Sequence, residues 1–490
     1  MKLPRVAVVL LSLATCMSAM TGRAADEGSA SKMPVTTVSE AAAHYFETGM
    51  VHYENHRWNF ALRDWNEAVK LDPNFAQAYV WICFTTSDPA EEARDRAKAK
   101  ALINEVTPGE QLLIRWMVGV RENRYVEGIM AMNDMLARFP HDKRLNFLAG
   151  YWLYRQDEYE IAKKVTLRAL ADDPNYATCY NQLGYVYSRL GGLDKALEYT
   201  AKYIQLLPNE PNPRDSYAEM LRFAGRYTEA LEQYRIALKI DPTFYISQKE
   251  MGETYSLMGE EEQARKEYEK AIHEAPSNGA KAEYMQKRAL TYVREKKYAE
   301  ADAAYLDAAA KARAMEQWLW EARAYRVMAM YEPDPAAAMK NLDQAEALLA
   351  AASGKVAQLD LDEEKAHVLR VRVERALAAG DRSTAQRLVA ELEKMAAPGA
   401  SVNTQRIYQG AEGTLLVDQK KYAESIPYLE EDIANPLSMK LLVTAYSKTK
   451  APGEAASLSK KLRGWKVPSI EEALAESDSS VPAGALAEKK

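Results

Sequence analysis

The chain has 490 residues and a formal net charge of -6 at pH 7. Hydrophobic residues make up 48% of it and charged residues 27%, which is ordinary for a soluble folded protein. Nucleic-acid binders normally carry a basic face, and the net negative charge of this chain gives no sign of one, so no nucleic-acid partner is expected. A single compact core would be unusually large at this length, whereas an array of small stacked units has no such limit.

The start of the chain, residues 1–24, predicts a secretory signal peptide. Lys2 and Arg5 form a charged start, an apolar run follows over residues 6–13, and Gly22 and Ala24 are small residues suited to cleavage after Ala24. This pattern predicts a periplasmic or secreted protein. Residues 25–40 have no periodicity and are expected to form a flexible lead.

A second interpretation of the same region is lipid anchoring. Leu13-Ala14-Thr15-Cys16 approximates a bacterial lipobox, although Thr15 is larger than the residue usually found before the cysteine. Lipidation of Cys16 would make the protein an outer-membrane lipoprotein. No later apolar stretch is long enough for a membrane span.

Two sets of residues repeat with one period along the chain. The first set is Pro140, Pro174, Pro208, Pro242 and Pro276, and the second is Gly128, Ala162, Ala196, Ala230 and Ala264. Both sets keep one constant step, and this step equals the length of a helix–turn–helix repeat, about 34 residues. Proline cannot continue a helix, so each proline is expected to separate one pair of helices from the next. The small residues are expected to allow close approach of the two helices in a pair.

The most regular block carries a family resemblance. Its residues are Tyr180, Leu183, Gly184, Tyr187, Ala196, Thr200, Tyr203 and Pro208, and Gly150 and Gly252 occupy the place of Gly184 in other units. The block resembles the tetratricopeptide repeat family, with Tyr180 and Thr200 in place of the usual Trp and Phe. The resemblance implies an all-α, right-handed solenoid of about eleven or twelve repeats.

The regularity of the pattern divides the chain. Residues 41–310 are predicted to form the repeat array, which is strictest over 109–276. Residues 311–465 lose the terminating prolines, and degenerate repeats with longer helices or longer loops are expected there. Residues 466–490 contain prolines, serines and glutamates, and a disordered tail is predicted.

Catalytic motifs are missing from the sequence. There is no phosphate-binding loop, zinc-protease motif or nucleophile elbow, so neither an enzyme nor a cofactor is predicted. His52 and His56 have a spacing that could hold a metal, but no further ligands complete a set, and His52 occupies a packing position of the repeat. No metal site is therefore predicted. Cys83 is expected to be a small buried packing residue.

The resemblance implies a binding groove lined by the first helix of each repeat. By register the predicted groove residues are Leu113, Met117, Phe147, Tyr151, Tyr154, Arg155, Asn181, Tyr185 and Arg189. Farther along, the same positions carry charged residues, among them Glu219, Lys249 and Glu253. Aromatic residues beside arginine are typical of binding hot spots. The alternative is that these aromatics only pack against neighbouring helices.

The combined hypothesis is a non-catalytic scaffold of the bacterial cell envelope that binds a protein or an extended peptide in this groove. One alternative is a lipid-anchored subunit of an envelope assembly or export machine, which requires a lipidated Cys16. A remote alternative is an enzyme with its site in the C-terminal third. The sequence predicts neither the identity of the partner nor the oligomeric state.

Overall fold

The computed structural model describes residues 32–86 and 88–477, and all regular structure in these residues is helical. The signal peptide and Cys16 lie outside the described residues. The chain divides into two compact units. Unit 1 contains the described residues up to Ala224 with the short segments Ala357–Leu359 and Pro398–Ala400, and unit 2 contains the rest.

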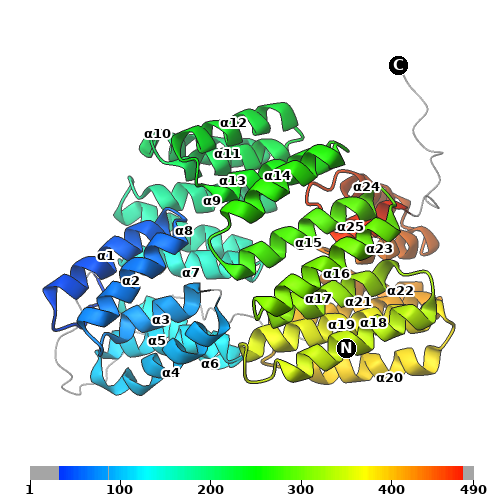
Figure 1. The fold of residues 1–490 in the computed structure, drawn as a ribbon, viewed down its shortest axis with the longest axis horizontal. Helices are drawn as coiled ribbons and strands as arrows, with labels where there is room; N and C mark the ends of the chain where they lie inside the picture. Colours follow the sequence, from blue (N-terminus) through cyan, green and yellow to red (C-terminus); the bar gives the residue numbers. More distant parts are fainter. Residues whose placement is uncertain (1–31, 87, 478–490) are drawn as a thin grey trace. The chain divides into compact units, whose positions relative to one another are not determined.

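The helices of unit 1 follow each other with short connections (Figure 1). They are α1 (Glu40–Glu54), α2 (Trp58–Leu71), α3 (Ala76–Thr85), α4 (Pro89–Ala101), the short 3₁₀ helix η1 (Ile103–Glu105), α5 (Pro108–Arg121), α6 (Tyr125–Arg138), α7 (Lys143–Arg155), α8 (Tyr159–Asp172), α9 (Ala177–Arg189), α10 (Leu193–Leu206) and α11 (Pro211–Phe223).

Unit 2 continues in the same manner. Its helices are α12 (Tyr227–Ile240), α13 (Tyr245–Leu257), α14 (Glu261–Glu274), α15 (Asn278–Arg294), α16 (Tyr298–Ala314), α17 (Trp318–Tyr331), α18 (Pro335–Ala351), α19 (Gln358–Ala378, of which the first two residues belong to unit 1), α20 (Arg382–Met395), α21 (Val402–Asp418), α22 (Tyr422–Glu431), α23 (Pro436–Lys448), α24 (Pro452–Arg463) and α25 (Ile470–Ser477).

Consecutive helices pack in pairs within each unit. In unit 1, α1 contacts α2, α3 contacts α4, and this continues to α9 with α10. In unit 2, α13 with α14, α15 with α16, α17 with α18, α21 with α22 and α23 with α24 behave alike. The second helix of a pair also contacts the first helix of the next, as α8 does with α9. The predicted all-α solenoid of stacked helix pairs is thus confirmed as the fold class.

The five periodic prolines lie where the sequence predicts. Pro140, Pro174, Pro208, Pro242 and Pro276 each stand in the connection between one helix pair and the next. Several helices after such connections begin with a side-chain cap. Thr107 accepts the backbone N–H of Glu110, and the carboxylate of Glu110 accepts the N–H of Thr107, which forms a capping box.

The turn inside each pair has a second periodic feature that the sequence analysis missed. Residues with positive φ occur at Asn123, Asp157, Gly191, Gly225 and Gly259, again with the repeat period. A left-handed residue at this place ends the first helix, and the N–H of the following Gly192 then donates to the carbonyl of Tyr187 at 2.8 Å. Glycine, asparagine and aspartate tolerate this conformation best, which explains their recurrence there.

Close packing within a pair depends on a small residue opposite a larger one sixteen positions later. The observed combinations are Gly49 with Trp65, Gly150 with Thr166, Gly184 with Thr200, Gly252 with Tyr268 and Gly413 with Leu429. A Cβ atom at Gly184 would lie 2.5 Å from Cγ2 of Thr200, which leaves no room for any other residue. The Gly413 combination shows that the same packing persists beyond residue 311, where the sequence pattern weakens.

After residue 311 the structure shows both longer helices and, at 352–357 and 396–401, longer connections than most of those between earlier pairs. Helix α18 has 17 residues and α19 has 21, whereas α7 and α9 have 13. Helices α19 and α20 share a buried apolar cluster that includes Val373 and Leu388. The pairs therefore continue, with added turns that shift the spacing of the alanines.

Both predicted flexible ends differ from expectation within the described residues. Thr36 of the lead donates from N and Oγ1 to the two carboxylate oxygens of Glu110 at 2.7 and 2.6 Å. The Pro34 carbonyl accepts a 2.8 Å hydrogen bond from the Gln77 amide. At the other end, residues 470–477 form α25 and are not a disordered tail. Side-chain partners far away in sequence hold both segments, and local composition does not reveal such partners.

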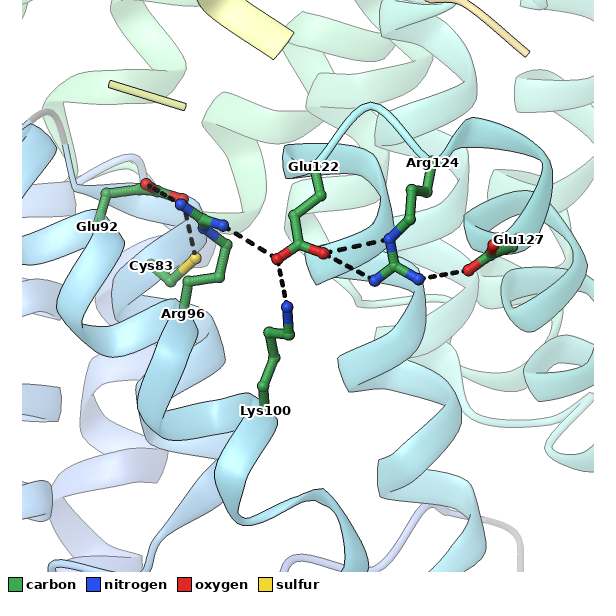
Figure 2. A network of polar contacts seen from close by, with 7 residues as sticks. All are labelled: Cys83, Glu92, Arg96, Lys100, Glu122, Arg124 and Glu127. Carbon is green, nitrogen blue, oxygen red and sulfur yellow. Dashed lines mark hydrogen bonds and ion pairs between the residues drawn. The ribbon is translucent and has the colours of Figure 1, made fainter. Parts of the chain in front are cut away.

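A polar network joins the second and third helix pairs (Figure 2). Its members are Cys83, Glu92, Arg96, Lys100, Glu122, Arg124 and Glu127. Arg96 lies at the centre, because its Nε is 2.9 Å from Glu92 and its Nη1 is 3.0 Å from Glu122. Burial and the Glu92 carboxylate raise the pKa of the Cys83 thiol. Cys83 is 1% exposed, as a packing residue should be, and it is a poor nucleophile.

Candidate functional site

The candidate site is the face of unit 1 that carries the predicted groove residues of α5, α7 and α9. The hairpin between α1 and α2 covers part of this face. Glu54 at the end of α1 pairs with Arg144 of α7 at 2.8 Å and accepts a 2.7 Å hydrogen bond from the Tyr176 hydroxyl. Arg57 of the hairpin turn pairs with Glu210 before α11 at 2.9 Å. The first helix pair thus contacts the fourth, fifth and sixth pairs through charged side chains.

His56 lies at the tip of this hairpin. Its Nε2 is 3.2 Å from Asn181 Nδ2 of α9, a contact that suits a neutral imidazole accepting from the amide. Burial lowers the pKa of His56 from 6.5 to about 4, so the ring is uncharged at neutral pH. The turn itself requires a left-handed residue, because the φ of His56 is +57°.

Four of the predicted groove residues are buried in the structure. Leu113 and Met117 are each 1% exposed, Phe147 is 6% exposed and Asn181 is 3% exposed. Phe147 packs in a cluster with Tyr176, Cys179 and Tyr53, and Asn181 contacts His56. The expectation that these four side chains lie on an open surface is therefore wrong, and for Phe147 and Asn181 the covering residues belong to the chain's own first helix pair.

Five predicted residues stay at the surface and lie together. We call them the tyrosine face: Tyr151, Tyr154, Arg155, Tyr185 and Arg189. The rings of Tyr154 and Tyr185 meet edge-on with centroids 6.2 Å apart, and Nε of Arg189 is 3.4 Å from the Tyr154 hydroxyl. The three tyrosines are half-buried and the two arginines are exposed. The face combines rigid aromatic surface with two accessible cations.

A ladder between repeats extends the tyrosine face toward α11. The Tyr185 hydroxyl donates to Oε2 of Glu219 at 2.6 Å, and these two residues are 34 positions apart. Burial and the Glu219 carboxylate raise the pKa of Tyr185, which keeps the phenol protonated as a donor. In unit 2 the same step joins Glu253 and Lys287 at 2.7 Å. Sequence reasoning placed Glu219 on this face but missed the bond, although the repeat period applied to polar residues would have predicted it.

The potentially reactive residues of unit 1 include His52, Cys83 and Cys179. His52 lies 3.5 Å from Asp64, and within the described ranges no group of three or more histidine, cysteine or acidic residues could hold a metal ion. Cys83 and Cys179 are both buried free thiols. No helix in the described part of the chain has the length and apolar composition needed to cross a membrane.

A pH dependence follows from the burial of His56. Because its pKa is depressed in the folded state, neutral His56 contributes stability above pH 6.5, and this contribution is lost as the pH falls toward 4. We expect His56→Asn, which tolerates the left-handed turn, to lose less thermal stability than the wild type between pH 7 and pH 5. Circular dichroism melts at both pH values measure this. Since the other histidines are the same in both chains, equal losses would show that His56 is not the titrating group.

Comparisons with known proteins agree with the repeat assignment in two segments. Residues 165–198 and residues 250–278 both match the family described as Tetratricopeptide repeat. The chain is 28% identical over 183 residues to the human Protein O-mannosyl-transferase TMTC1, which covers 35% of this chain and 21% of that protein. It is 26% identical over 231 residues to the mouse Superkiller complex protein 3, covering 45% of this chain and 15% of that protein. The chain thus spans about a fifth or less of the length of these relatives.

Solved structures that match this chain include a tetratricopeptide repeat protein from Parabacteroides merdae. That structure has 14% identity and a TM-score of 0.36, and the match covers 56% of this chain and 94% of the other. The yeast Tom70 has 16% identity and a TM-score of 0.42, with 86% of this chain and 96% of the other covered. Two segments of this chain are thus similar to tetratricopeptide repeats, and they lie within an array of tandem helix pairs.

Proposed function

We propose that this protein is a non-catalytic scaffold of the bacterial cell envelope, and that it binds a protein or an extended peptide on the tyrosine face of unit 1. The observation that carries the proposal is the accessible group of Tyr151, Tyr154 and Tyr185 with Arg155 and Arg189 beside it. Tyrosine and arginine are, together with tryptophan, the residues enriched at interface hot spots.

The chemistry of the face indicates how a partner is held. The tyrosines offer apolar ring surface with little side-chain entropy to lose, and their hydroxyls are hydrogen-bonding groups. The exposed Arg155 guanidinium can form two parallel hydrogen bonds with a carboxylate. An extended segment with an aromatic or apolar side chain next to an acidic residue fits this arrangement.

The envelope location rests on residues 1–24 of the sequence, which have the features of a secretory signal. A lipid-anchored form through Cys16 is the alternative. A mass spectrum of the mature N-terminus distinguishes the two: a chain that starts at or near Ala25 supports export in free form, and a lipidated Cys16 supports anchoring.

An enzymatic role has one source of support, the similarity to Protein O-mannosyl-transferase TMTC1. This chain covers 21% of that protein, and its two family matches are to the repeats. Repeats of this kind recognise other proteins by their surfaces, so we propose that the resemblance reflects shared repeats and not transferase activity.

Charge reversal on the tyrosine face tests the proposal. We expect Arg155→Glu to reduce capture of the partner from a cell-envelope extract by roughly 30-fold, the loss typical of a hot-spot residue. Lys164→Glu is the matched control, because Lys164 is an exposed cation on α8 of the same helix pair. Both variants should melt at the temperature of the wild type. Equal capture by all three chains, quantified by mass spectrometry, would contradict binding at this face.

A further inference from the structure

Helix α25 stands outside the helix pairs. It follows α24 after the short segment 464–469 and contacts both α15 and α23, which are the first helices of two pairs well separated in the chain (Figure 1). A helix that only capped the end of the array would lie on α23 and α24. Helix α25 instead extends to a face built by first helices, which is the kind of face that repeat arrays use for binding.

The apolar side of α25 packs on that face. Ile470 and Ala473 are 8% and 9% exposed and belong to one cluster with Leu290 and Val293 of α15. Leu474 packs against the same cluster. Tyr305, Val327 and Met328 complete the surface beneath. We call this surface, built by the first helices α15 and α17 with Tyr305 of the second helix α16, the α15 face.

The acidic side of α25 meets arginines of the array. Glu472 is 2% exposed and forms an ion pair with Arg294 at the end of α15. Arg294 is fixed from the other side, because its Nε lies 2.9 Å from Glu261. Burial opposes the charge of Arg326 on α17, but the carboxylates of Glu364, Glu471 and Glu374 outweigh it and raise the pKa of that guanidinium. Glu472 of α25 thus pairs with a cation of α15, and the Glu471 carboxylate lies near enough to Arg326 of α17 and Glu374 of α19 to raise the pKa of both.

The contacts define a recognition pattern. Apolar residues stand at 470, 473 and 474, a helical spacing that makes one stripe, and acidic residues stand between them at 471 and 472. We propose that the α15 face is a receptor for short acidic amphipathic helices, that α25 is its intramolecular occupant, and that a partner helix of the same chemistry displaces α25. This site is separate from the tyrosine face, so either proposal can fail without the other.

Displacement is physically reasonable because α25 is short. A helix of 8 residues has little stability of its own, so α25 depends on its contacts with the face. Two of its buried apolar side chains are the small Ala473 and Ala475. A short tether gives α25 an effective concentration in the millimolar range, and a partner helix with larger apolar residues can overcome this advantage.

The test uses the full chain and a fluorescein-labelled synthetic peptide with the sequence of residues 467–477, VPSIEEALAES. The released variant carries Ile470→Asp and Leu474→Asp, which remove the apolar stripe of α25 and leave the α15 face intact. Fluorescence anisotropy should show at least about tenfold tighter binding of the peptide to the released variant than to the wild type, because the occupant no longer competes. Ala456→Asp, at an exposed position of α24, is the matched control and should bind like the wild type.

Charge exchange tests the acidic part of the pattern. A peptide with Glu472→Lys should bind the released variant at least about tenfold more weakly than the native peptide, since its lysine would face Arg294. Adding Arg294→Glu to the released variant should reverse this preference. Binding of both peptides with equal affinity would overturn the assigned recognition chemistry.

A second measurement applies if release of α25 also destabilises the protein. If the released variant unfolds more easily, native peptide added in trans should raise its melting temperature in proportion to the logarithm of peptide concentration. If the native peptide neither binds the released variant more tightly than the wild type nor raises its melting temperature, the proposal is overturned. The Arg155→Glu capture experiment is independent of both readouts, so the two proposals fail in distinguishable ways.

Discussion

Arg370→Met should destabilise unit 2 by about 3–5 kcal/mol, the cost of leaving a buried charge without its partner. Arg370 of α19 is 4% exposed, and its Nη1 lies 2.7 Å from Oδ2 of Asp432, which is 5% exposed. Its Nη2 donates to the Ser438 hydroxyl of α23 at 2.8 Å. The substitution removes both contacts and leaves the buried Asp432 carboxylate without its cation, although the Ser438 hydroxyl still donates to Oδ2 at 2.5 Å.

A second substitution separates the cost of the stranded charge from the loss of packing. We expect Arg370→Met with Asp432→Leu to recover most of the lost stability, because two apolar residues can replace a buried ion pair at little cost. Denaturant unfolding gives the free energies, and hydrogen exchange of α19, α22 and α23 locates the change. A double variant as unstable as the single one would show that the arginine acts through its shape and not through its charge.

Trp65→Ala should destabilise unit 1 by about 3–5 kcal/mol through the cavity it leaves. Trp65 is fully buried, and its ring centroid lies 5.9 Å from that of Tyr53 and 5.6 Å from that of Trp81. Its indole N–H also donates to the Phe46 carbonyl at 3.2 Å. Since Tyr53 and Glu54 belong to the hairpin that covers part of the inner face, hydrogen exchange in residues 53–57 should rise with the loss of stability.

The pairing of Trp65 with Gly49 supplies the control. A Cβ at Gly49 would lie 2.4 Å from Nε1 of Trp65, so Gly49→Leu alone should be destabilising by overpacking. In the Trp65→Ala background the added leucine has a cavity to enter, and we expect it to restore part of the lost stability. Thermal melts of the four chains measure this coupling. If Gly49→Leu has the same effect in both backgrounds, the two positions do not share one packing site.

The predicted groove shows where sequence reasoning stops. The repeat register placed Tyr151 of α7 and Tyr185 of α9 on one face. In the structure these two helices do meet, because the ring of Tyr154 on α7 packs against that of Tyr185 on α9. Register could not show that Phe147 and Asn181 are covered, because the covering residues are Tyr53 and His56 of the first helix pair. Their contact joins segments more than 90 positions apart, and no period connects them.

The tail makes the same point in unit 2. The composition of residues 466–490 resembles that of a mobile segment, yet residues 470–477 form a helix because Glu472 pairs with Arg294 and Ile470 packs near Leu290. An isolated segment of this length would not be a stable helix in water. Its order comes from a surface that the rest of the unit builds.

The sequence by itself determined the helix pairs, their terminating prolines, and the small residues such as Gly184 and Ala196 that let the two helices of a pair approach closely. These features depend on contacts within one repeat or between neighbours, so a constant period along the chain is enough to reveal them. The tertiary structure decided which predicted groove residues stay open and what occupies the α15 face. Those outcomes depend on the hairpin at Glu54 and on α25, whose contacts cross several repeats and therefore leave no periodic trace in the sequence.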